Sequence, residues 1–252
     1  MSSKNDRDFV LWEGVYPKLE DVHSKAKGFQ SDRWLERITE QLLIYREALK
    51  SNPHAMPPRP SDLPMLVALT EASRIVDYGG SSAWAYEFVQ ATTSKNKITD
   101  YLCIEIDTVV NYLCSLDIHA PTIRYDNTLG GIGSGFDIFY SNSTLQYVYD
   151  DTFFFNAIDE IQPHWLLLED FLGGNFDDFF TIQNYYESKI PVKFRNQNQF
   201  IEGLCGYDLI LSKPYASPVF GQINKLPMEN FSKDFRVEYS QTMLFKKKLQ
   251  IK

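Results

Sequence analysis

The chain has 252 residues, a length that suits one large α/β domain or a core domain with an appendage. Its formal net charge is −8, which argues against nucleic acid as a main partner because phosphate binding needs clustered positive charge. The polar N-terminus indicates no signal peptide, and the sequence has no apolar run long enough to cross a bilayer. Cys103, Cys114 and Cys205 stand in apolar segments without metal or CxxC spacing. We therefore expect a cytoplasmic protein with reduced core cysteines, no metal and no membrane span.

The first sixty residues are expected to form an N-terminal extension. Residues 9–30 are rich in aromatic side chains and are predicted to be an irregular arm. Ser31 can cap a helix that runs to about Lys50, because apolar residues recur there at helical spacing. Residues 51–60 form a proline-rich connector that no helix could cross. This connector is either a linker or the hinge of a cap over a pocket.

Residues 61–252 are expected to form the main domain, in which short apolar strands alternate with helices. Such alternation implies right-handed crossovers and a Rossmann-like, doubly wound and mostly parallel α/β sheet. The last strand is antiparallel to its neighbours if it pairs with the strand before it, and an insertion at about 170–195 lies on the substrate side. The predicted strands are 74–78, 101–106, 122–125, 136–141, 165–169, 207–211 and 241–247, and the predicted helices are 61–73, 82–92, 108–116, 151–161 and 196–205.

The stretch from Arg74 to Trp84, RIVDYGGSSAW, organises this domain. An apolar strand breaks at Gly79 and Gly80 and then opens a helix, which is how α/β folds present backbone N–H groups to a ligand. The NAD fingerprint needs glycines at the first, third and sixth positions of the loop, and it fails from either glycine. This disfavours an NAD-linked oxidoreductase. Asp77, beside the turn, can hold a ligand's ammonium group or fix the loop.

Further polar residues follow the next strands. Glu105, at the carboxyl end of the second strand, can accept hydrogen bonds from two ribose hydroxyls or can cap the following helix. Asp126, after the third strand, can meet an adenine amino group or serve as a turn residue. The loop after the fourth strand carries Asn142, Gln146 and Tyr147 across the mouth of the expected crevice.

Together these motifs resemble a Rossmann-fold (class I) S-adenosylmethionine-dependent methyltransferase. More narrowly, the chain resembles a methyltransferase family encoded among surface-polysaccharide (capsule and O-antigen) biosynthesis genes, and the resemblance covers nearly the whole chain. The family's motifs match W-x-G-x-Y at Trp12–Tyr16, D-[FY]-G-G-S at Asp77–Ser81, L-Q-Y at Leu145–Tyr147, T-[IV]-Q at Thr181–Gln183 and L-F-[RK]-[RK] at Leu244–Lys247.

The resemblance implies S-adenosyl-L-methionine as cofactor and S-adenosyl-L-homocysteine as product. It implies that the methionine part lies at the glycine turn, the ribose at the acid after the second strand, and the adenine beside the third and fourth strands. The cofactor-binding residues expected on this basis are Asp77, Tyr78, Gly79, Gly80, Ser81, Glu105, Ile106, Asp126, Ser141 and Asn142.

Methyl transfer from a sulfonium is an in-line displacement, so alignment supplies much of the rate. A hydroxyl acceptor also needs a base or a polar group that orients it. The catalytic candidates are Gln146, Glu169 and Asp170. The substrate-binding candidates are Tyr147, Gln183, Tyr185, Tyr186 and, from the arm, Trp12 and Tyr16.

Two departures from the family pattern matter. Ala83 stands where the family often has a third glycine, and Glu169-Asp170 stand where it usually has Asp-Arg. An arginine would suit an anionic substrate group, so its absence weakens a direct transfer of the family's substrate.

We expect O-methylation of a carbohydrate or nucleotide-linked precursor of a surface polysaccharide. The weak set of candidate bases keeps an alternative open, a catalytically silent subunit that binds the adenosyl ligand and supports an active partner. A homodimer also stays open.

Overall fold

The computed structural model describes residues 10–23, 28–93, 98–185, 188–215 and 225–249. The expected α/β architecture is confirmed: a seven-stranded sheet has the order β10-β11-β6-β5-β2-β3-β4. Its strands are β2 (Arg74–Tyr78), β3 (Asp100–Ile104), β4 (Ile123–Asp126), β5 (Ile138–Asn142), β6 (Trp165–Phe171), β10 (Tyr207–Pro214) and β11 (Gln241–Lys247).

Five of these strands, β2 to β6, are parallel to one another. The last strand, β11, is inserted between β6 and β10 and is antiparallel to both. The prediction of a parallel sheet with an antiparallel last strand is therefore confirmed. Because parallel strands end at the same edge, the segments after β2, β3, β5 and β6 meet there.

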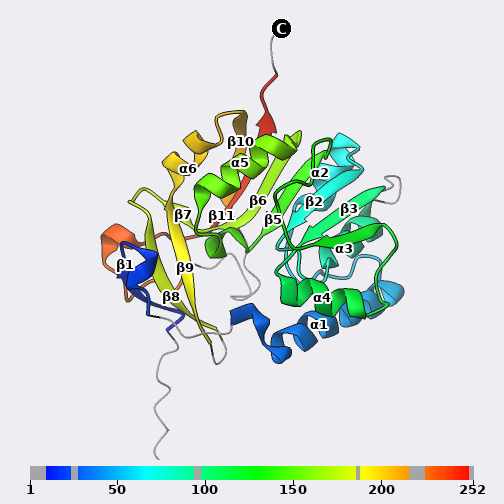
Figure 1. Cartoon of the computed structure of the whole chain (residues 1–252), viewed down its shortest axis with the longest axis horizontal. Helices are drawn as coiled ribbons and strands as arrows, with labels where there is room; N and C mark the ends of the chain where they lie inside the picture. Colours follow the sequence, from blue (N-terminus) through cyan, green and yellow to red (C-terminus); the bar gives the residue numbers. More distant parts are fainter. Residues whose placement is uncertain (1–9, 24–27, 94–97, 186–187, 216–224, 250–252) are drawn as a thin grey trace, which may run out of the picture.

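Helices cover both faces of the sheet (Figure 1). Alternate strand residues point to opposite faces, so Val76 and Phe139 pack with α5 and α6, whereas Ile75 and Ile138 pack with α2 and α3. The N-terminal helix α1 packs against α3 and α4, and Ser31 caps it as expected, accepting a hydrogen bond from the Trp34 N–H at 3.3 Å. The helices are α1 (Asp32–Ser51), α2 (Leu63–Thr70), α3 (Trp84–Thr92), α4 (Asp107–Ser115), α5 (Asp151–Ile161) and α6 (Gln197–Gly203).

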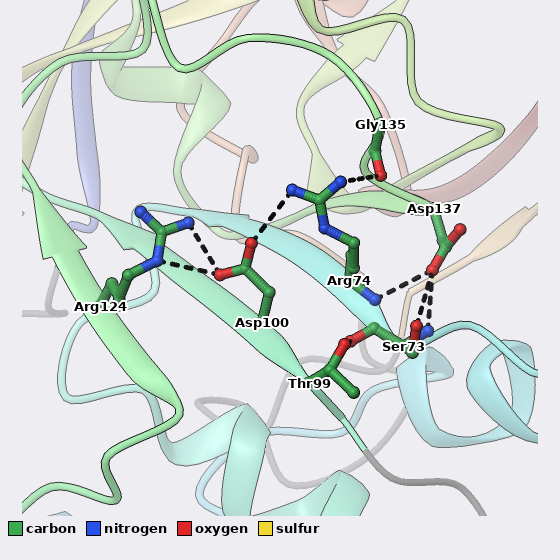
Figure 2. A network of polar contacts seen from close by, with 7 residues as sticks. All are labelled: Ser73, Arg74, Thr99, Asp100, Arg124, Gly135 and Asp137. Carbon is green, nitrogen blue, oxygen red and sulfur yellow. Dashed lines mark hydrogen bonds and ion pairs between the residues drawn. The ribbon is translucent and has the colours of Figure 1, made fainter.

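A polar network ties the strands together at their amino ends, opposite the edge where the ligand crevice is expected (Figure 2). The Asp100 carboxylate accepts hydrogen bonds from Arg124 at 2.7 and 3.0 Å and from Arg74 at 3.2 Å. Asp137 accepts from the backbone N–H groups of Ser73 and Arg74 at 2.8 and 2.9 Å. These bonds join the starts of β2, β3, β4 and β5, and they fix the register of the parallel strands.

The arm is not irregular as predicted, because it contributes a strand to a second, four-stranded sheet with the order β1-β8-β9-β7. This sheet lies beside the larger one, and its other strands come from the expected insertion (Figure 1). Trp12, Phe179, Phe194 and Phe231 form part of a separate core beneath it. The strands are β1 (Trp12–Tyr16), β7 (Gly173–Gly174), β8 (Phe179–Tyr185) and β9 (Ser188–Asn196), and short 3-10 turns are η1 (Leu19–Asp21), η2 (Gly28–Gln30), η3 (Leu145–Tyr147) and η5 (Lys233–Phe235).

Several local predictions are corrected. Cys103 is buried, but Cys114 and Cys205 are exposed, because Cys114 lies on the outer side of α4 and Cys205 lies in the turn after α6. β6 and β10 extend beyond their predicted ends, to Phe171 and Pro214, and α2 is shorter than predicted at both ends. Among the described residues, the structure contains no helix with the length and apolar character that a membrane crossing requires.

Candidate functional site

The glycine turn after β2 has no room for side chains. Gly79 has φ +73°, and a Cβ there would lie 2.1 Å from Oγ1 of Thr144, in the loop after β5. A Cβ on Gly80 would lie 2.3 Å from Oδ2 of Asp77. The Gly79 N–H donates to the Ile104 carbonyl at 2.8 Å, which joins the turn to the end of β3. Both glycines are therefore required for the close approach of neighbouring atoms.

Asp77 lies beneath this turn and is 1% exposed. Its Oδ2 accepts a hydrogen bond from the Tyr101 hydroxyl at 2.6 Å. Burial raises the pKa of Asp77 to about 7; the bond from Tyr101 opposes this rise, and the negative charges of Glu105 and Glu169 add to it. The carboxylate thus bonds a residue of β3 and packs closely at Gly80, and the two roles considered for it, holding an ammonium group or fixing the loop, stay predictions.

Glu105 joins the end of β3 to the glycine turn. Its Oε1 accepts from the Ser81 N–H at 2.9 Å, and its Oε2 accepts from the Ile106 N–H at 3.1 Å. The alternative role as a helix cap is wrong, because the side chain bonds the turn and the α4 cap position, Ile106, has no side-chain cap bond. Burial raises the pKa of Glu105, while the two backbone N–H groups oppose that rise. Each carboxylate oxygen keeps further acceptor capacity for a ligand.

A hollow of about 560 Å³ lies at the carboxyl ends of β3 and β4, and Ile106, the residue after Glu105, is part of its lining. Asp126 is adjacent to it and serves as a turn residue, since its Oδ1 accepts from the N–H groups of Asn127 and Thr128 at 2.7 and 3.1 Å. The hollow is lined by Gln30, Ile106, Asp107, Thr108, Asn127 and Thr128.

A buried polar network occupies the ends of β5 and β6. Glu169 is 4% exposed; its Oε1 accepts from the Asp62 N–H at 2.7 Å, and its Oε2 accepts from the Asn142 amide at 2.9 Å and the Tyr140 hydroxyl at 3.1 Å. Burial raises the pKa of Glu169 to about 7, although its hydrogen bonds oppose the rise. The network links the proline-rich connector to the edge of the sheet, because the Asn142 amide also donates to the Pro60 carbonyl at 3.2 Å.

Neighbouring residues extend this network. Ser141 donates to the Tyr78 carbonyl at 3.0 Å and so holds β5 to the glycine turn. Ser143 donates to Oδ2 of Asp170 at 2.6 Å, and burial raises the pKa of that carboxyl. Tyr215, which directly follows β10, has its hydroxyl 3.2 Å from the Asn142 side-chain oxygen.

Backbone strain is concentrated at the same edge. Among the described residues six non-glycines have positive φ, and four of them are Ser81, Ala83, Ser143 and Asp170. Left-handed conformations are costly for residues with a Cβ and persist where the surroundings impose them, commonly at functional sites. Ala83, which stands where the related family often has glycine, keeps the left-handed conformation of a glycine at φ 54°.

The predicted substrate residues are partly brought together. The Tyr147 hydroxyl donates to Oε1 of Gln183 at 2.8 Å, and Gln183 is paired with Trp12 across β8 and β1. The Trp12 side chain is buried in the second core against Phe194, with ring centroids 5.3 Å apart, and Tyr16 is half-buried farther along β1. Tyr185 ends β8, and Tyr186 lies outside the described residues.

Gln146 lies in η3, directly before Tyr147. Its side chain is 5% exposed, and its Oε1 has no hydrogen-bond partner among the described residues. A buried amide oxygen without a partner costs free energy of order 1–3 kcal/mol, and a ligand that donates to it would recover that cost.

Sequence reasoning missed several residues of this region. Phe29, in η2, packs its ring against Tyr147 with centroids 4.8 Å apart, while the adjacent Gln30 lines the hollow. The arm thus reaches both the hollow and the substrate candidates. Tyr140 and Tyr215 gave only a weak signal, a hydroxyl toward the carboxyl end of a strand, and Tyr101, at the start of β3, gave none.

No protein-family model and no curated protein matches the sequence. Among solved structures, a Haloferax volcanii protein described as a methyltransferase, in complex with the activator Trm112, is 13% identical, with a TM-score of 0.50 over 88% of this chain and 97% of its own. The chain has a methyltransferase fold. Two S-adenosylmethionine-dependent methyltransferase structures are also similar. The one from Listeria monocytogenes is 10% identical, with a TM-score of 0.49 over 71% of this chain and 93% of its own. The one from Mesorhizobium loti is 12% identical, with a TM-score of 0.47 over 74% of this chain and 97% of its own.

Proposed function

We propose that this chain binds S-adenosyl-L-methionine and methylates a hydroxyl oxygen of a carbohydrate or nucleotide-linked precursor of a surface polysaccharide, leaving S-adenosyl-L-homocysteine as product. The observation that carries the cofactor assignment is the Glu105 carboxylate. It is bonded to the Ser81 N–H of a glycine turn, and the next residue, Ile106, lines a hollow of about 560 Å³. An acid in this place suits a ribose diol, and a hollow next to it suits a base.

The residues present fit this cofactor. The turn from Tyr78 to Ser81 would hold the methionine part, Glu105 the ribose, and Ile106 and Asn127 the adenine in the hollow. Ser141 holds the end of β5 against the turn, and both Ser141 and Asn142 would border the same crevice. When bound, the sulfonium supplies an activated methyl group, so the protein has mainly to align the acceptor and exclude water.

The acceptor would lie toward η3 and the second sheet. The unpartnered Oε1 of Gln146 can accept a hydrogen bond from the acceptor hydroxyl and orient it. The hydrogen-bonded pair of Tyr147 and Gln183 adds polar groups beside the ring of Phe29. Small-molecule sites usually combine a few polar groups with aromatic side chains in this way. Asp170, half-buried and with a raised pKa, is the candidate proton acceptor. Glu169, buried and fully engaged, would act by positioning Asn142.

Calorimetric titration tests the cofactor assignment. We expect the wild-type protein to bind S-adenosylhomocysteine and not NAD, and we expect Glu105→Ala to weaken binding at least tenfold, about 1.4 kcal/mol. Glu202→Ala is the matched control, because it removes one exposed carboxylate from α6, away from the glycine turn. No binding of S-adenosylhomocysteine to the wild-type protein, or equal affinity in a well-folded Glu105→Ala variant, would contradict the proposal.

A second candidate function is a catalytically silent subunit that binds the adenosyl ligand for an active partner. It is favoured by the burial of Glu169, whose two carboxylate oxygens are both occupied, and by the activator complex in which the Haloferax volcanii methyltransferase was solved. Incubation with methyl-labelled cofactor and candidate glycan precursors distinguishes the two. Label transfer that Gln146→Ala abolishes, with S-adenosylhomocysteine affinity retained, supports the enzyme. No transfer to any precursor favours the silent subunit.

A further inference from the structure

We propose that the chain forms a twofold homodimer through the outer edge of β10. This strand ends the seven-stranded sheet and is hydrogen-bonded on one side, to β11. Three consecutive aliphatic residues, Leu209, Ile210 and Leu211, are exposed on it, and Ile210 is 54% exposed. A long apolar edge strand is a ready template for a further strand, and proteins normally cover or charge such an edge.

The strand's own geometry makes a second copy the fitting partner. The pairing of β10 with β11 skips Ile210, which is therefore the extra residue of a β-bulge. Because of this bulge, Asp208, Leu211 and Lys213 all point to the face of the sheet that α2 and α3 cover, as does Leu244 of β11. A twofold axis perpendicular to the sheet at Leu211 would place Leu211 against its symmetry mate. Because the bulged Ile210 adds no pairing position, Asp208 and Lys213 each lie two positions from Leu211 along the strand. The axis therefore also places Asp208 opposite Lys213 of the other copy, on the same face.

This register is self-complementary in charge. Each of the two symmetric positions joins an aspartate to a lysine, so the dimer gains two cross-strand ion pairs. Within one chain the Asp208 carboxylate is 3.9 Å from the Lys248 amine, and Lys213 contacts Asp62 at 2.5 Å. Both side chains keep large exposed fractions, 62% and 43%, so they can take a second partner.

Further apolar side chains are exposed on the same side of the sheet. Met65 and Leu69 of α2 are 52% and 75% exposed, and α2 covers the same face of the sheet as Leu211. A strand edge flanked by further apolar side chains can bury more area than the edge alone, as a specific interface requires. A twofold axis closes the contact at two copies, so the assembly would not grow into fibres.

Sedimentation velocity over a concentration series tests the proposal through charge reversal. We expect the wild-type protein to be dimeric, and we expect Asp208→Lys and Lys213→Asp, each alone, to weaken dimerisation at least tenfold, because each places like charges opposite one another twice. When the two variants are mixed, dimers should reappear. One cross-strand pair then joins two introduced charges of opposite sign, and the other joins two native ones.

Ile210→Lys should also give monomers, whereas Ile44→Lys, at an equally exposed aliphatic position on α1, should leave the dimer intact. Circular dichroism melts confirm that each variant is folded. A wild-type protein that stays monomeric at the highest concentration overturns the proposal. So does a dimer that both charge reversals leave unchanged.

Discussion

Asp77 is a buried carboxyl beneath the glycine turn, and its burial raises its pKa. Its carboxylate is 1% exposed and touches Gly80, and its hydrogen-bond partner is the neutral Tyr101 hydroxyl, so no cation compensates the charge. Burying a charged carboxylate without a cation is unfavourable. The pKa of Asp77 is therefore raised to about 7 from 3.8, and the charged form costs stability in the folded protein.

The sign of the resulting pH dependence follows from linkage. Between pH 3.8 and about 7 the folded protein holds a proton on Asp77 that the unfolded chain has lost, so this residue's contribution to stability falls as pH rises through that window. Asp77→Asn removes the titration and keeps the shape. We expect the variant's free energy of unfolding, relative to wild type, to be higher at pH 8 than at pH 5.

Urea unfolding at the two pH values measures this difference. Glu169 titrates in the same window but is present in both proteins, so its effect largely cancels in the comparison. Tyr101→Phe is the companion variant: it removes the donor to Asp77 and should make the loss of stability with rising pH steeper. A relative stability of Asp77→Asn that does not change with pH would show that the carboxyl titrates near its ordinary value.

The connector before α2 is attached to the sheet at its last residue and through the α2 cap that follows it. Pro60 is bonded to Asn142, and Asp62 to Glu169, at the ends of β5 and β6. The connector is thus attached directly to the edge of the sheet where the cofactor is proposed to bind. The two interpretations of the connector, a linker or the hinge of a cap over the pocket, both stay predictions.

Elements also show where sequence reasoning succeeds. The parallel strands and their helices were predictable, because each carries its apolar pattern within a few residues, and the turn of Gly79 and Gly80 is marked by local sequence. The second sheet was not predictable from the sequence. Its strand at Trp12 is interrupted by Gly14 at φ +80°, and it pairs with β8, far along the chain.

In the candidate site too, some residues were predictable from the local sequence and others were not. Asp77 and Glu105 were identified because each follows or ends a recognisable strand. Tyr140 and Tyr215 were missed, because their hydroxyl groups acquire partners only when β5, β6 and the end of β10 align. Sequence periodicity describes which side chains face the core, and it does not describe which polar atoms meet across strands.

At the scale of the whole molecule, two cores are joined by buried charges at the start of α5. Arg195 of β9 is 1% exposed, and its Nε donates to Oδ1 of Asp151 at 2.9 Å. Lys193, also on β9, contacts Asp151 at 2.7 Å and Asp178 at 2.9 Å. The two cations and two carboxylates balance in charge, and they fasten the second sheet to the methyltransferase fold next to η3 and its substrate candidates.

Removing one member of this cluster should weaken the whole molecule. Arg195→Met keeps most of the side-chain volume but removes the guanidinium that lies over the Phe200 ring and leaves Asp151 short of a partner, so we expect the free energy of unfolding to fall by about 3 kcal/mol. Lys189→Met, on the same strand, alters an exposed pair with Glu13 and should cost less than about 1 kcal/mol. Urea unfolding followed by far-ultraviolet circular dichroism compares the two. Equal losses would mean that the buried charges do not hold the two cores together, and the second sheet would then be fastened by its apolar contacts alone.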